Sequence, residues 1–448
     1  MLRCLSLMAF GLAVGTASAA EPANKPNVIV FLTDDVGYAE YGFQGNKEIP
    51  TPNIDSIAKN GARFTSGYVS GPYCSPTRAG LMTGRYQTRF GHEWNEGPAV
   101  QKDGRTFGLA VEEKTIADRL KALGYATCAI GKWHLGAGDE FVATARGFDE
   151  FYGTVGNSPF VNPPRFIDSR KSTTAGKIDD ANFYTTEAYA DRAVDWIGKQ
   201  KNKPYFLYVP FNAMHTPLTA PKKYVDRFPN IQNDKRKVFA AVMSGMDDAV
   251  GKILNAVRET KQEENTLIFF LCDNGGPTPV TTSKNDPLRG LKATTLEGGV
   301  RVPFCVQWKG TIPSGKTYNH PIIQLDILPT AVIAAGGTVD PAWKLDGVDI
   351  LPHLTGKTEA KPHEALFWRF GEQWAIRKGD WKLVVNRIDG ANKPAALYNL
   401  KDDIGEATDL ADKEPERAKA LKIEWDKWNE ANIAARWIPS PAKKKNKD

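Results

Sequence analysis

The stretch Asn27-Val28-Ile29-Val30-Phe31-Leu32, followed by Thr33-Asp34-Asp35, decides the fold of this chain. An unbroken apolar run of this length is typical of a strand that is buried on both faces of a sheet. Similar runs at 126–130 (ATCAI), 205–211 (YFLYVPF) and 266–272 (TLIFFLC) alternate with helix-like patterns at 115–124, 186–199 and 236–260. This alternation predicts an α/β protein whose large, mostly parallel sheet is sandwiched by helices.

The pattern changes after about residue 358. Short aromatic runs (ALFWRF, WAIRKGDWKLVV, ALYNL) are followed by one amphipathic pattern at 414–432. We expect a smaller antiparallel sheet plus a helix, packed on the main body. The chain of 448 residues, which is longer than one core usually serves, then divides into a main domain, 20–358, and a C-terminal subdomain, 359–448, with a basic tail (Lys443, Lys444, Lys445, Lys447).

Composition excludes several classes of protein. The hydrophobic fraction of 41% and the charged fraction of 25% are those of a globular protein, not of a disordered or fibrous one. The net charge of +6 at pH 7 is spread along the chain instead of being concentrated on one element. We therefore expect no nucleic-acid partner.

The first residues resemble an export signal. Met1–Ala20 holds one Arg, an apolar stretch at 5–14 and the small residues Ala17-Ser18-Ala19. The apolar stretch is too short to span a bilayer. We expect a signal peptide at 1–19, a periplasmic or extracellular protein, and no membrane association of the mature form.

Removal of that signal leaves the cysteines at 74, 128, 272 and 305. An even number in an oxidising compartment permits two disulfides. However, Cys128, Cys272 and Cys305 lie in apolar strand-like runs, which is typical of buried thiols. Cys74 differs from them because it lies in a polar turn, SGPYCSPTR.

Polar residues follow all four apolar runs. Because ligands bind at the carboxyl ends of the strands in an open parallel sheet, these residues are expected to converge. One such residue alone is more often a turn or a cap, whereas four sets together favour a single site. The sets are Asp34 and Asp35, Lys132 and His134, His215, and Asp273 and Asn274.

The residue types predict the chemistry of this site. The acidic residues and Asn274 offer only oxygen ligands, which suit Ca²⁺ or Mg²⁺ better than Zn²⁺. Lys132, His134 and His215 are donors for an anionic substrate. A hard cation and cationic side chains around a nucleophile indicate a site that displaces an ester of sulfate or phosphate.

The nucleophile is predicted in Cys74-Ser75-Pro76-Thr77-Arg78. Ser75 would cap a helix whose first residue is Pro76, so that Cys74 lies just outside a helix N-terminus that favours negative charge. Arg78, in the first turn, would point at the same anion. The alternative is an ordinary helix start beside an incidental cysteine.

The run C-S-P-T-R, followed by A-G-L-M-T-G-R, resembles the signature of the type I sulfatases, C-x-P-x-R-x-x-x-x-T-G. A second signature of that family matches residues 124–136 (GYATCAIGKWHLG). The resemblance extends from NVIVFLTDD through NGG, Lys292 with EGGVRVPF, and LYNLKDDIGEATDL, over nearly the whole mature chain. Thr77 stands where serine is commoner in the family. The resemblance implies an alkaline phosphatase-like fold, and it is closest to bacterial exported polysaccharide or N-acetylgalactosamine-sulfate-type sulfatases.

The resemblance also implies cofactors and roles. Cys74 would be oxidised to Cα-formylglycine by a formylglycine-generating or sulfatase-maturating enzyme. Arg78 would orient the hydrated aldehyde, Lys132 would contact it and the sulfate, and His134 would accept its proton. His215 and Lys292 would hold the sulfate, and one of the two, with His215 favoured over Lys292, would protonate the leaving alcohol. The metal, usually Ca²⁺ with Mg²⁺ as the alternative, would be held by Asp34, Asp35, Asp273, Asn274 and residue 74.

The implied reaction has two steps. One hydroxyl of the hydrated formylglycine attacks sulfur and displaces the alcohol, and the second hydroxyl then loses its proton to His134, so that sulfate is expelled.

Export and the aromatic stretch at 85–98 (RYQTRFGHEWNEGP) suggest a sulfated carbohydrate as the substrate, of the galactose- or N-acetylgalactosamine-sulfate type, such as carrageenan or chondroitin fragments. Candidate sugar-binding residues are His92, Glu93, Trp94, Asn95 and Arg289, each with a packing or loop role as the open alternative. Two other functions stay open: a phosphoester or phosphonate hydrolase of the same superfamily, and a catalytically silent carbohydrate-binding protein. The oxygen-only, single-metal ligand set argues against the phosphoester or phosphonate hydrolase.

Overall fold

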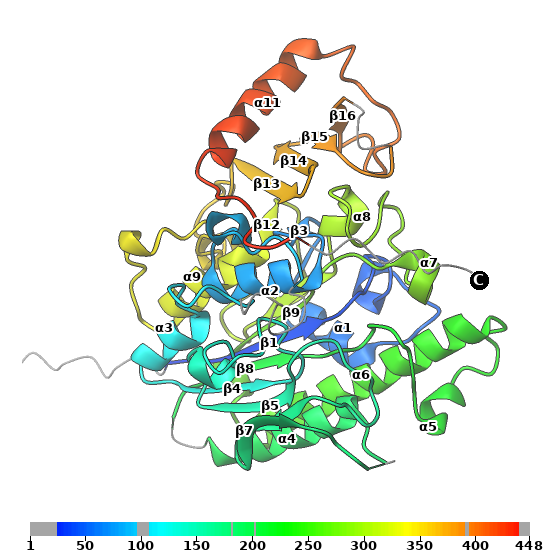
Figure 1. Cartoon of the computed structure of the whole chain (residues 1–448), viewed down its shortest axis with the longest axis vertical. Coiled ribbons are helices and arrows are strands. Elements are labelled where there is room, and N and C mark those ends of the chain that lie inside the picture. The colour runs from blue at the N-terminus through cyan, green and yellow to red at the C-terminus, as the bar shows by residue number, and fades with distance from the viewer. Residues whose placement is uncertain (1–24, 96–106, 181, 201–202, 390–393, 439–448) are drawn as a thin grey trace, which may run out of the picture.

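A ten-stranded mixed sheet forms the centre of the computed structural model, which describes residues 25–95, 107–180, 182–200, 203–389 and 394–438 (Figure 1). The strand order is β11-β2-β10-β9-β1-β8-β4-β5-β6-β7. The strands from β9 to β5 are parallel, and mixed short strands extend both edges. The predicted α/β class is therefore confirmed. The strands are β1 (Asn27–Thr33), β2 (Ala62–Phe64), β4 (Ala126–Ile130), β5 (Glu150–Thr154), β6 (Phe166–Asp168), β7 (Ser172–Gly176), β8 (Tyr205–Pro210), β9 (Thr266–Cys272), β10 (Phe304–Gln307) and β11 (Lys316–Tyr318).

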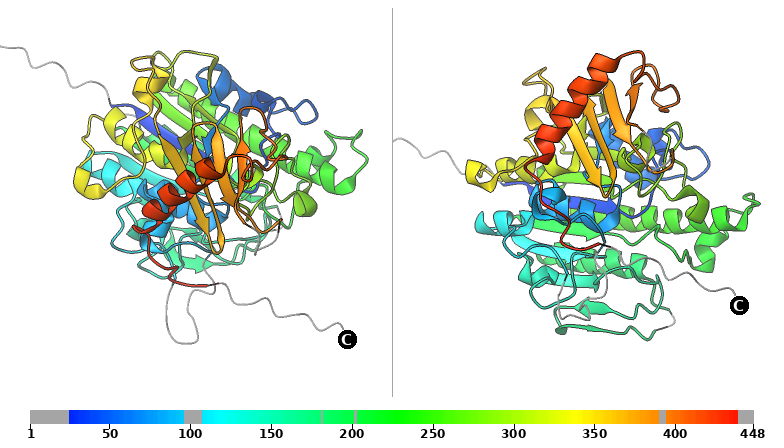
Figure 2. Two further views of the ribbon diagram at one scale, coloured as in Figure 1. Left: turned by 90° about the horizontal axis from the view of Figure 1, so that it is seen from above. Right: turned by 45° about the horizontal axis from the view of Figure 1, so that its top comes forward.

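The central strands are apolar throughout because helices cover both faces of the sheet. All residues of β1, β4, β8 and β9 are buried. On one face pack α1 (Pro52–Lys59), α4 (Thr185–Lys199) and α6 (Asp234–Glu259); on the other pack α2 (Cys74–Thr83), α3 (Ile116–Ala122) and α9 (Ile327–Ala334) (Figures 1 and 2). The helix-like patterns predicted at 115–124, 186–199 and 236–260 correspond to α3, α4 and α6.

A four-stranded antiparallel sheet and one helix form the C-terminal part, as predicted. The strands are β13 (Ala365–Phe370), β14 (Gln373–Lys378), β15 (Trp381–Val385) and β16 (Ala396–Asn399), and α11 (Pro415–Asn429) packs against β14 and β15. The predicted division near residue 358 falls between α10 (Leu351–Leu354) and β13. This unit stands on the main body above α2 (Figure 1).

The chain returns to the main body after α11. In this segment, 433–437, which we call the strap, the amide of Ile433 donates to the carbonyl of Thr88 and the amide of Arg436 donates to the carbonyl of Gly91. The Trp437 side chain is 7% exposed. The strap therefore joins the end of the C-terminal part to the segment that follows α2.

The remaining elements are short. They are η1 (Gly42–Gln44), β3 (Gly67–Tyr68), η2 (Gln87–Phe90), η3 (Ala143–Ala145), α5 (Lys222–Val225), η4 (Glu263–Asn265), α7 (Thr278–Thr281), α8 (Glu297–Val300), β12 (Ile322–Ile323), η5 (Gln324–Asp326) and η6 (Pro341–Trp343). Strands β3 and β12 pair in parallel.

Cys74, Cys128, Cys272 and Cys305 are buried free thiols, as the apolar context of the last three predicted. Within the described ranges, no helix has the length and hydropathy needed to span a membrane. The predicted signal peptide at 1–19 and the lysines of the tail lie outside the described residues.

Candidate active site

The register of β1 and β9 brings the acidic residues together. Thr33, the last residue of β1, pairs with Cys272, the last residue of β9, so Asp34 and Asp273 leave the sheet side by side. The amide of Asp35 donates to Asp273 Oδ1 at 3.2 Å. Asp35 has φ of 63°, in the left-handed region that non-glycine residues seldom adopt. The turn after β1 is thereby bent back toward the end of β9.

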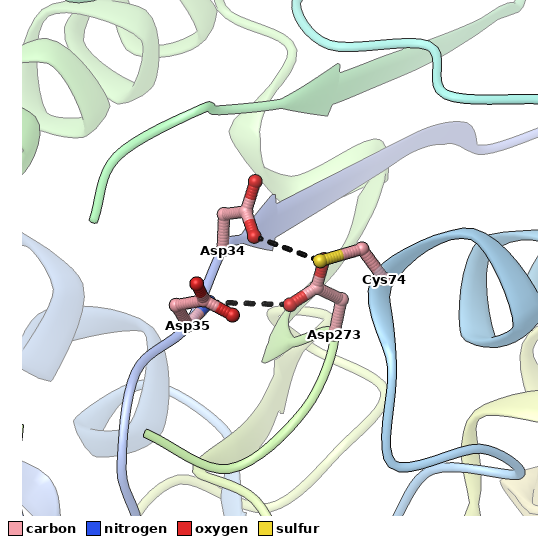
Figure 3. A group of neighbouring side chains, drawn as sticks. All are labelled: Asp34, Asp35, Cys74 and Asp273. Atoms are coloured by element: carbon pink, nitrogen blue, oxygen red, sulfur yellow. Dashed lines mark hydrogen bonds between the residues drawn. The ribbon is translucent and has the colours of Figure 1, made fainter. Parts of the chain in front are cut away.

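Cys74 completes this cluster (Figure 3). One ligand atom from each of Asp34, Asp35, Asp273 and Cys74 lies within 4.8 Å of the others, and all four residues are buried. Cys74 Sγ is 3.3 Å from Asp34 Oδ1 and 3.3 Å from Lys292 Nζ. The structure thus joins strand ends and a helix start that are far apart in the sequence.

Helix α2 begins earlier than the sequence predicted. Its first residue is Cys74 and its N-cap is Tyr73, so Cys74 belongs to the helix and Ser75 is not the cap. The reason is tertiary: Asn95 Oδ1 accepts the amide of Ser75 at 2.9 Å, and Ser75 Oγ lies 2.6 Å from His92 Nε2. The Asn95 side chain, from the loop after α2, therefore accepts a backbone amide at the start of the helix, which is the capping role that we expected of the Ser75 hydroxyl.

Arg78 lies one turn further along α2 and is fully buried. Its Nε and Nη2 donate to Asp273 Oδ2 at 3.2 and 2.8 Å, and its Nη1 donates to the carbonyl of Lys132 at 2.7 Å. Arg78 thus connects α2 to the ends of β9 and β4.

Two lysines contact different carboxylates of the acidic cluster. Lys132 Nζ contacts Asp34, and Lys292 Nζ contacts Asp35 at 2.6 Å. Lys132 follows Gly131, where φ is 141° and an added Cβ would meet the carbonyl oxygen of Pro210 at 1.9 Å. Only glycine allows β4 and β8 to approach this closely at the end of the sheet.

His134 and His215 also lie at this edge of the sheet. His134 is 5% exposed, its φ is 56°, and its Nδ1 has no hydrogen-bond partner among the described residues. His215 Nε2 lies 4.0 Å from Asp35 Oδ2, and its Nδ1 lies 2.7 Å from the carbonyl of Thr216. The His215 ring thus contacts the cluster, and the His134 ring lies near enough to feel the charges of Lys132, Arg78 and Asp34.

Burial controls how these groups ionise. It lowers the pKa of His134 well below its ordinary value, and the charges of Lys132 and Arg78 lower it further, so this imidazole is neutral. The pKa of His215 is also lowered, by burial and then by Lys132. A neutral imidazole is a proton acceptor.

The pKa of Asp34 is lowered in this site, whereas that of the Cys74 thiol is raised. Burial alone would raise the pKa of Asp34, but the surrounding cations, above all Lys132, outweigh it and hold this pKa well below its ordinary value. Burial raises the pKa of the Cys74 thiol, and the charges of Asp273 and Asp34 raise it further. These charges outweigh the helix dipole, which contributes only about 0.3–1 kcal/mol at an exposed site.

The donor set fits a hard divalent cation. The cluster offers carboxylate oxygens, and the adjacent Asn274 has a buried Oδ1 without a hydrogen-bond partner among the described residues. Asn274 Nδ2 donates to Asp35 Oδ1 at 2.8 Å, so the amide lies against the same carboxylate. An unpaired buried acceptor is costly, and a cation at this position would satisfy it.

The candidate sugar-binding residues occupy different places. His92 supports Ser75, as described, and the carboxylate of the buried Glu93 pairs with Arg369 Nη2 at 3.0 Å. Asn95 binds the amide of Ser75. Trp94 is half-buried and lines a cavity, whereas Arg289 pairs with Asp389 in the C-terminal part. The structure therefore brings Glu93 and Trp94 to a cavity, while the side chains of His92 and Asn95 contact Ser75.

Sequence reasoning missed residues that border the site from the C-terminal part. The ring of Tyr73, adjacent to Cys74, lies 5.6 Å from the ring of Phe370 and 5.1 Å from Lys292 Nζ. Gln373 Nε2 donates to the carbonyl of Ala293 at 3.1 Å. No local pattern relates residues this far apart in the sequence, and only tertiary packing brings them together.

Comparisons with known proteins agree with this geometry. The family model "Sulfatase" matches residues 26–337. N-acetylgalactosamine-6-sulfatase of Canis lupus familiaris is 32% identical over 84% of this chain and 74% of its own, and human (Homo sapiens) arylsulfatase A is 31% identical over 92% and 89%. The crystal structure of Ps i-CgsB in complex with k-i-k-neocarrahexaose has a TM-score of 0.83 and 34% identity over 93% of this chain and 95% of its own. The chain therefore belongs to the sulfatase family of sulfuric ester hydrolases.

Proposed function

We propose that this protein is an exported sulfatase that hydrolyses sulfate esters on a sulfated carbohydrate, with Cα-formylglycine derived from Cys74 as its nucleophile. The observation that carries this proposal is the position of Cys74. It begins helix α2 in a buried cluster, 3.3 Å from a carboxylate oxygen of Asp34 and 3.3 Å from Lys292 Nζ.

The charges of this centre indicate what a metal would add to it. Three carboxylates (Asp34, Asp35, Asp273) face three basic side chains (Arg78, Lys132, Lys292), so the group is formally balanced. A bound Ca²⁺, or Mg²⁺ as the alternative, would supply an excess of positive charge that stabilises a sulfate ester and its transition state. Asp34, Asp35, Asp273 and Asn274 would hold the ion, with residue 74 beside them.

The aldehyde hydrate of formylglycine supplies one hydroxyl that attacks sulfur and another whose deprotonation expels sulfate. The Sγ atom of Cys74 stands in this structure for the oxygens of that hydrate. The oxidation requires a formylglycine-generating or sulfatase-maturating enzyme as a partner.

The side chains around residue 74 have separable roles. Arg78 fixes its orientation through Asp273 and the carbonyl of Lys132, and Lys132 and Lys292 bind sulfate oxygens. His134 is neutral and accepts the proton that residue 74 releases. We assign protonation of the leaving alcohol to His215, with Lys292 as the alternative. The imidazole of His215 must be charged for this step, and the negative charge of a bound sulfate ester raises its pKa toward that state.

A sulfated sugar of the galactose- or N-acetylgalactosamine-sulfate type is the proposed substrate, with carrageenan and chondroitin fragments as examples. Two relatives support this class, one named N-acetylgalactosamine-6-sulfatase and one crystallised with k-i-k-neocarrahexaose. Residues 20–358 would form the catalytic domain and 359–448 the C-terminal subdomain. The signal peptide at 1–19 would direct the protein to the periplasm or outside the cell, and N-terminal sequencing of the exported protein tests this.

Cys74→Ala is the decisive test of the nucleophile. We expect this variant to lose all turnover of sulfate esters, because no other side chain can provide the hydrate. It should still bind Ca²⁺ in a calorimetric titration, since the carboxylates and Asn274 are unchanged. Mass spectrometry of the wild-type peptide that contains residue 74 should show the aldehyde. Turnover by the Ala variant would refute the mechanism.

The substrate class is tested by comparing 4-nitrophenyl sulfate with 4-nitrophenyl phosphate, followed by carrageenan and chondroitin sulfate oligosaccharides. We expect release of sulfate only. Faster cleavage of the phosphate by the matured enzyme would contradict the proposal.

A further inference from the structure

A cavity beside the active site is lined by none of the residues that have a role in the reaction. Its volume is about 710 Å³, within the range of about 300–1,000 Å³ that is usual for small-molecule sites. Four segments form it: the loop at 93–94, the β13–β14 turn at 369–373, the end of β15 with its following residues at 385–387, and the strap with Ile438. Three of these segments belong to the C-terminal part, which sequence reasoning did not connect with the site.

The cavity adjoins the catalytic centre. Gln373, in its lining, donates from Nε2 to the carbonyl of Ala293, the residue after Lys292. Phe370, also in the lining, packs against Tyr73, the residue before Cys74. A group bound in the cavity is therefore separated from the nucleophile by about one side chain.

The aromatic wall of the cavity is built by a tight turn. Phe370 pairs with Gln373, so Gly371 and Glu372 form a two-residue hairpin loop. Gly371 has φ of 61°, and an added Cβ would lie 2.8 Å from Trp94 Cζ2. Glycine thus allows Trp94 to lie against the turn, with its ring 4.2 Å from that of Phe370. The ring of Trp94 is half-buried whereas that of Phe370 is buried, so Trp94 is the ring that can bind the apolar face of a sugar.

The charged wall differs from the aromatic one. Arg369 is neutralised by Glu93, at 3.0 Å. Arg387 is exposed, and its guanidinium has no hydrogen bond or ion pair within the part of the chain that the structure describes. The backbone amide of Arg387 donates to Gln373 Oε1 at 3.1 Å, so the residue is anchored while its side chain is free. A guanidinium that lines the same cavity as the Trp94 ring suits an anionic sugar, because it can bind sulfate or carboxylate in a bidentate manner.

We infer that this cavity is a subsite for the glycan residue next to the one that carries the scissile sulfate. Trp94 packs on its ring, and Arg387 binds an anionic substituent on it, either a sulfate or a uronate carboxylate. Glu372, which lines the cavity and is exposed, accepts hydrogen bonds from its hydroxyls. This inference rests on the proposed function and assigns Arg387 as a specificity residue for oligomeric, polyanionic substrates.

Arg387→Ala tests the subsite with two substrates. For a sulfated hexasaccharide we expect kcat/KM to fall about tenfold or more, mainly through KM, because a charge-assisted contact is lost. For 4-nitrophenyl sulfate, which is too small to reach the subsite, the fall should be at least several times smaller. Arg387→Lys should recover part of the loss. Arg417→Ala is the matched control, an exposed arginine of α11 that lies over the Trp381 ring and should leave both substrates unaffected.

The substituent is identified by the choice of hexasaccharide. A larger loss on chondroitin sulfate than on carrageenan would assign a carboxylate, and the reverse would assign a sulfate. Trp94→Ala should likewise lower kcat/KM more for the hexasaccharide than for 4-nitrophenyl sulfate. Trp94 precedes Asn95, which binds Ser75, so a substitution of Trp94 can also disturb the active site. The Arg387 variant is therefore the decisive one. The subsite would be refuted if Arg387→Ala lowered kcat/KM equally for a hexasaccharide and for 4-nitrophenyl sulfate, or if it lowered kcat/KM for no hexasaccharide.

The subsite and the proposed function can fail separately. If the wild-type protein with aldehyde at residue 74 cleaves no sulfate ester, the proposed function fails. Binding of the same hexasaccharides to Cys74→Ala, with and without Arg387→Ala, then decides the subsite alone. Weaker binding of the double variant supports it, and unchanged binding refutes it.

Discussion

Arg78 shows how one side chain fixes the geometry of the nucleophile helix. It is fully buried and contacts the end of β9 through Asp273 and the end of β4 through the carbonyl of Lys132. A lysine has the same charge but cannot make both contacts at once, since its ammonium group is a point charge and not a planar fork. The sequence predicted a role toward an anion for Arg78; the structure adds that it holds two strand ends together.

Arg78→Lys should therefore lower kcat/KM for sulfate esters by about 100-fold or more, a loss comparable to that of one preorganised donor in an active site. Steady-state kinetics of the matured enzyme on 4-nitrophenyl sulfate measures this. Arg85→Lys is the control, because Arg85 lies just beyond α2 in a partly exposed ion pair with Glu113. Similar activities of the two variants would contradict the role assigned to Arg78.

At the scale of the element, helix α1 is capped from outside its own sequence. Its N-cap residue, Thr51, makes no side-chain cap. Instead, Asp247 of α6 accepts the amides of Asn53 and Ile54 at 3.2 and 2.8 Å and the side chain of Asn53 at 2.8 Å. Two helices on the same face of the sheet are thereby joined through one buried carboxylate.

Asp247→Ala should destabilise the protein by about 1–3 kcal/mol, since it leaves buried donors without partners. Urea unfolding followed by circular dichroism measures the change. Asp248→Ala, at the neighbouring position, removes only a surface ion pair with Arg227 and should cost less than about 1 kcal/mol. Equal losses in the two variants would show that the cap contributes nothing beyond a surface contact.

At the scale of the whole molecule, the strap connects the C-terminal part to the nucleophile. Trp437 Nε1 donates to the carbonyl of Asn95 at 3.0 Å, and its ring lies 4.7 Å from that of His92. His92 and Asn95 in turn contact Ser75, next to Cys74. The strap also forms one wall of the cavity beside the active site.

Trp437→Ala should lower kcat by about tenfold as well as the melting temperature, because the loop that supports Ser75 loses its packing partner. Trp437→Phe should restore part of both. Ile433→Ala, which removes an exposed side chain of the same strap, should change neither. A lower melting temperature with unchanged kcat would mean that the strap contributes to stability alone.

The segment before β13 is attached to the main body by an ion pair. His363 Nε2 lies 2.8 Å from Oδ1 of Asp326, which also accepts the amides of Ile323 and Val348. Burial lowers the pKa of His363, but the charge of Asp326 outweighs it, so this pKa lies above the ordinary value of 6.5. The folded state therefore binds the proton more tightly than the unfolded state does.

The stability from this pair should be complete below pH 6.5 and should be lost as the pH rises through the raised pKa of His363. The difference in unfolding free energy between wild type and His363→Gln, measured from pH 5.5 to 9, should therefore shrink with increasing pH. His353→Gln is the control, since the ring of His353 contacts the backbone carbonyl of Ala360 and not a carboxylate. If the difference in unfolding free energy between wild type and His363→Gln grew with pH, the predicted stabilisation by charged His363 would be wrong.

The sequence by itself determined the central sheet, the residues at its strand ends and the nucleophile motif. Apolar runs such as β1 and β9 have no alternative to burial on both faces, and parallel strands must present Asp34 and Asp273 at one edge. Tertiary structure alone decided where α2 begins, what caps α1, and which side chains line the cavity beside the active site. The first two features depend on Asn95 and Asp247, whose hydrogen-bond partners are distant in the chain, and the third depends on the packing of four separate segments around one cavity. A local pattern carries no information about such contacts.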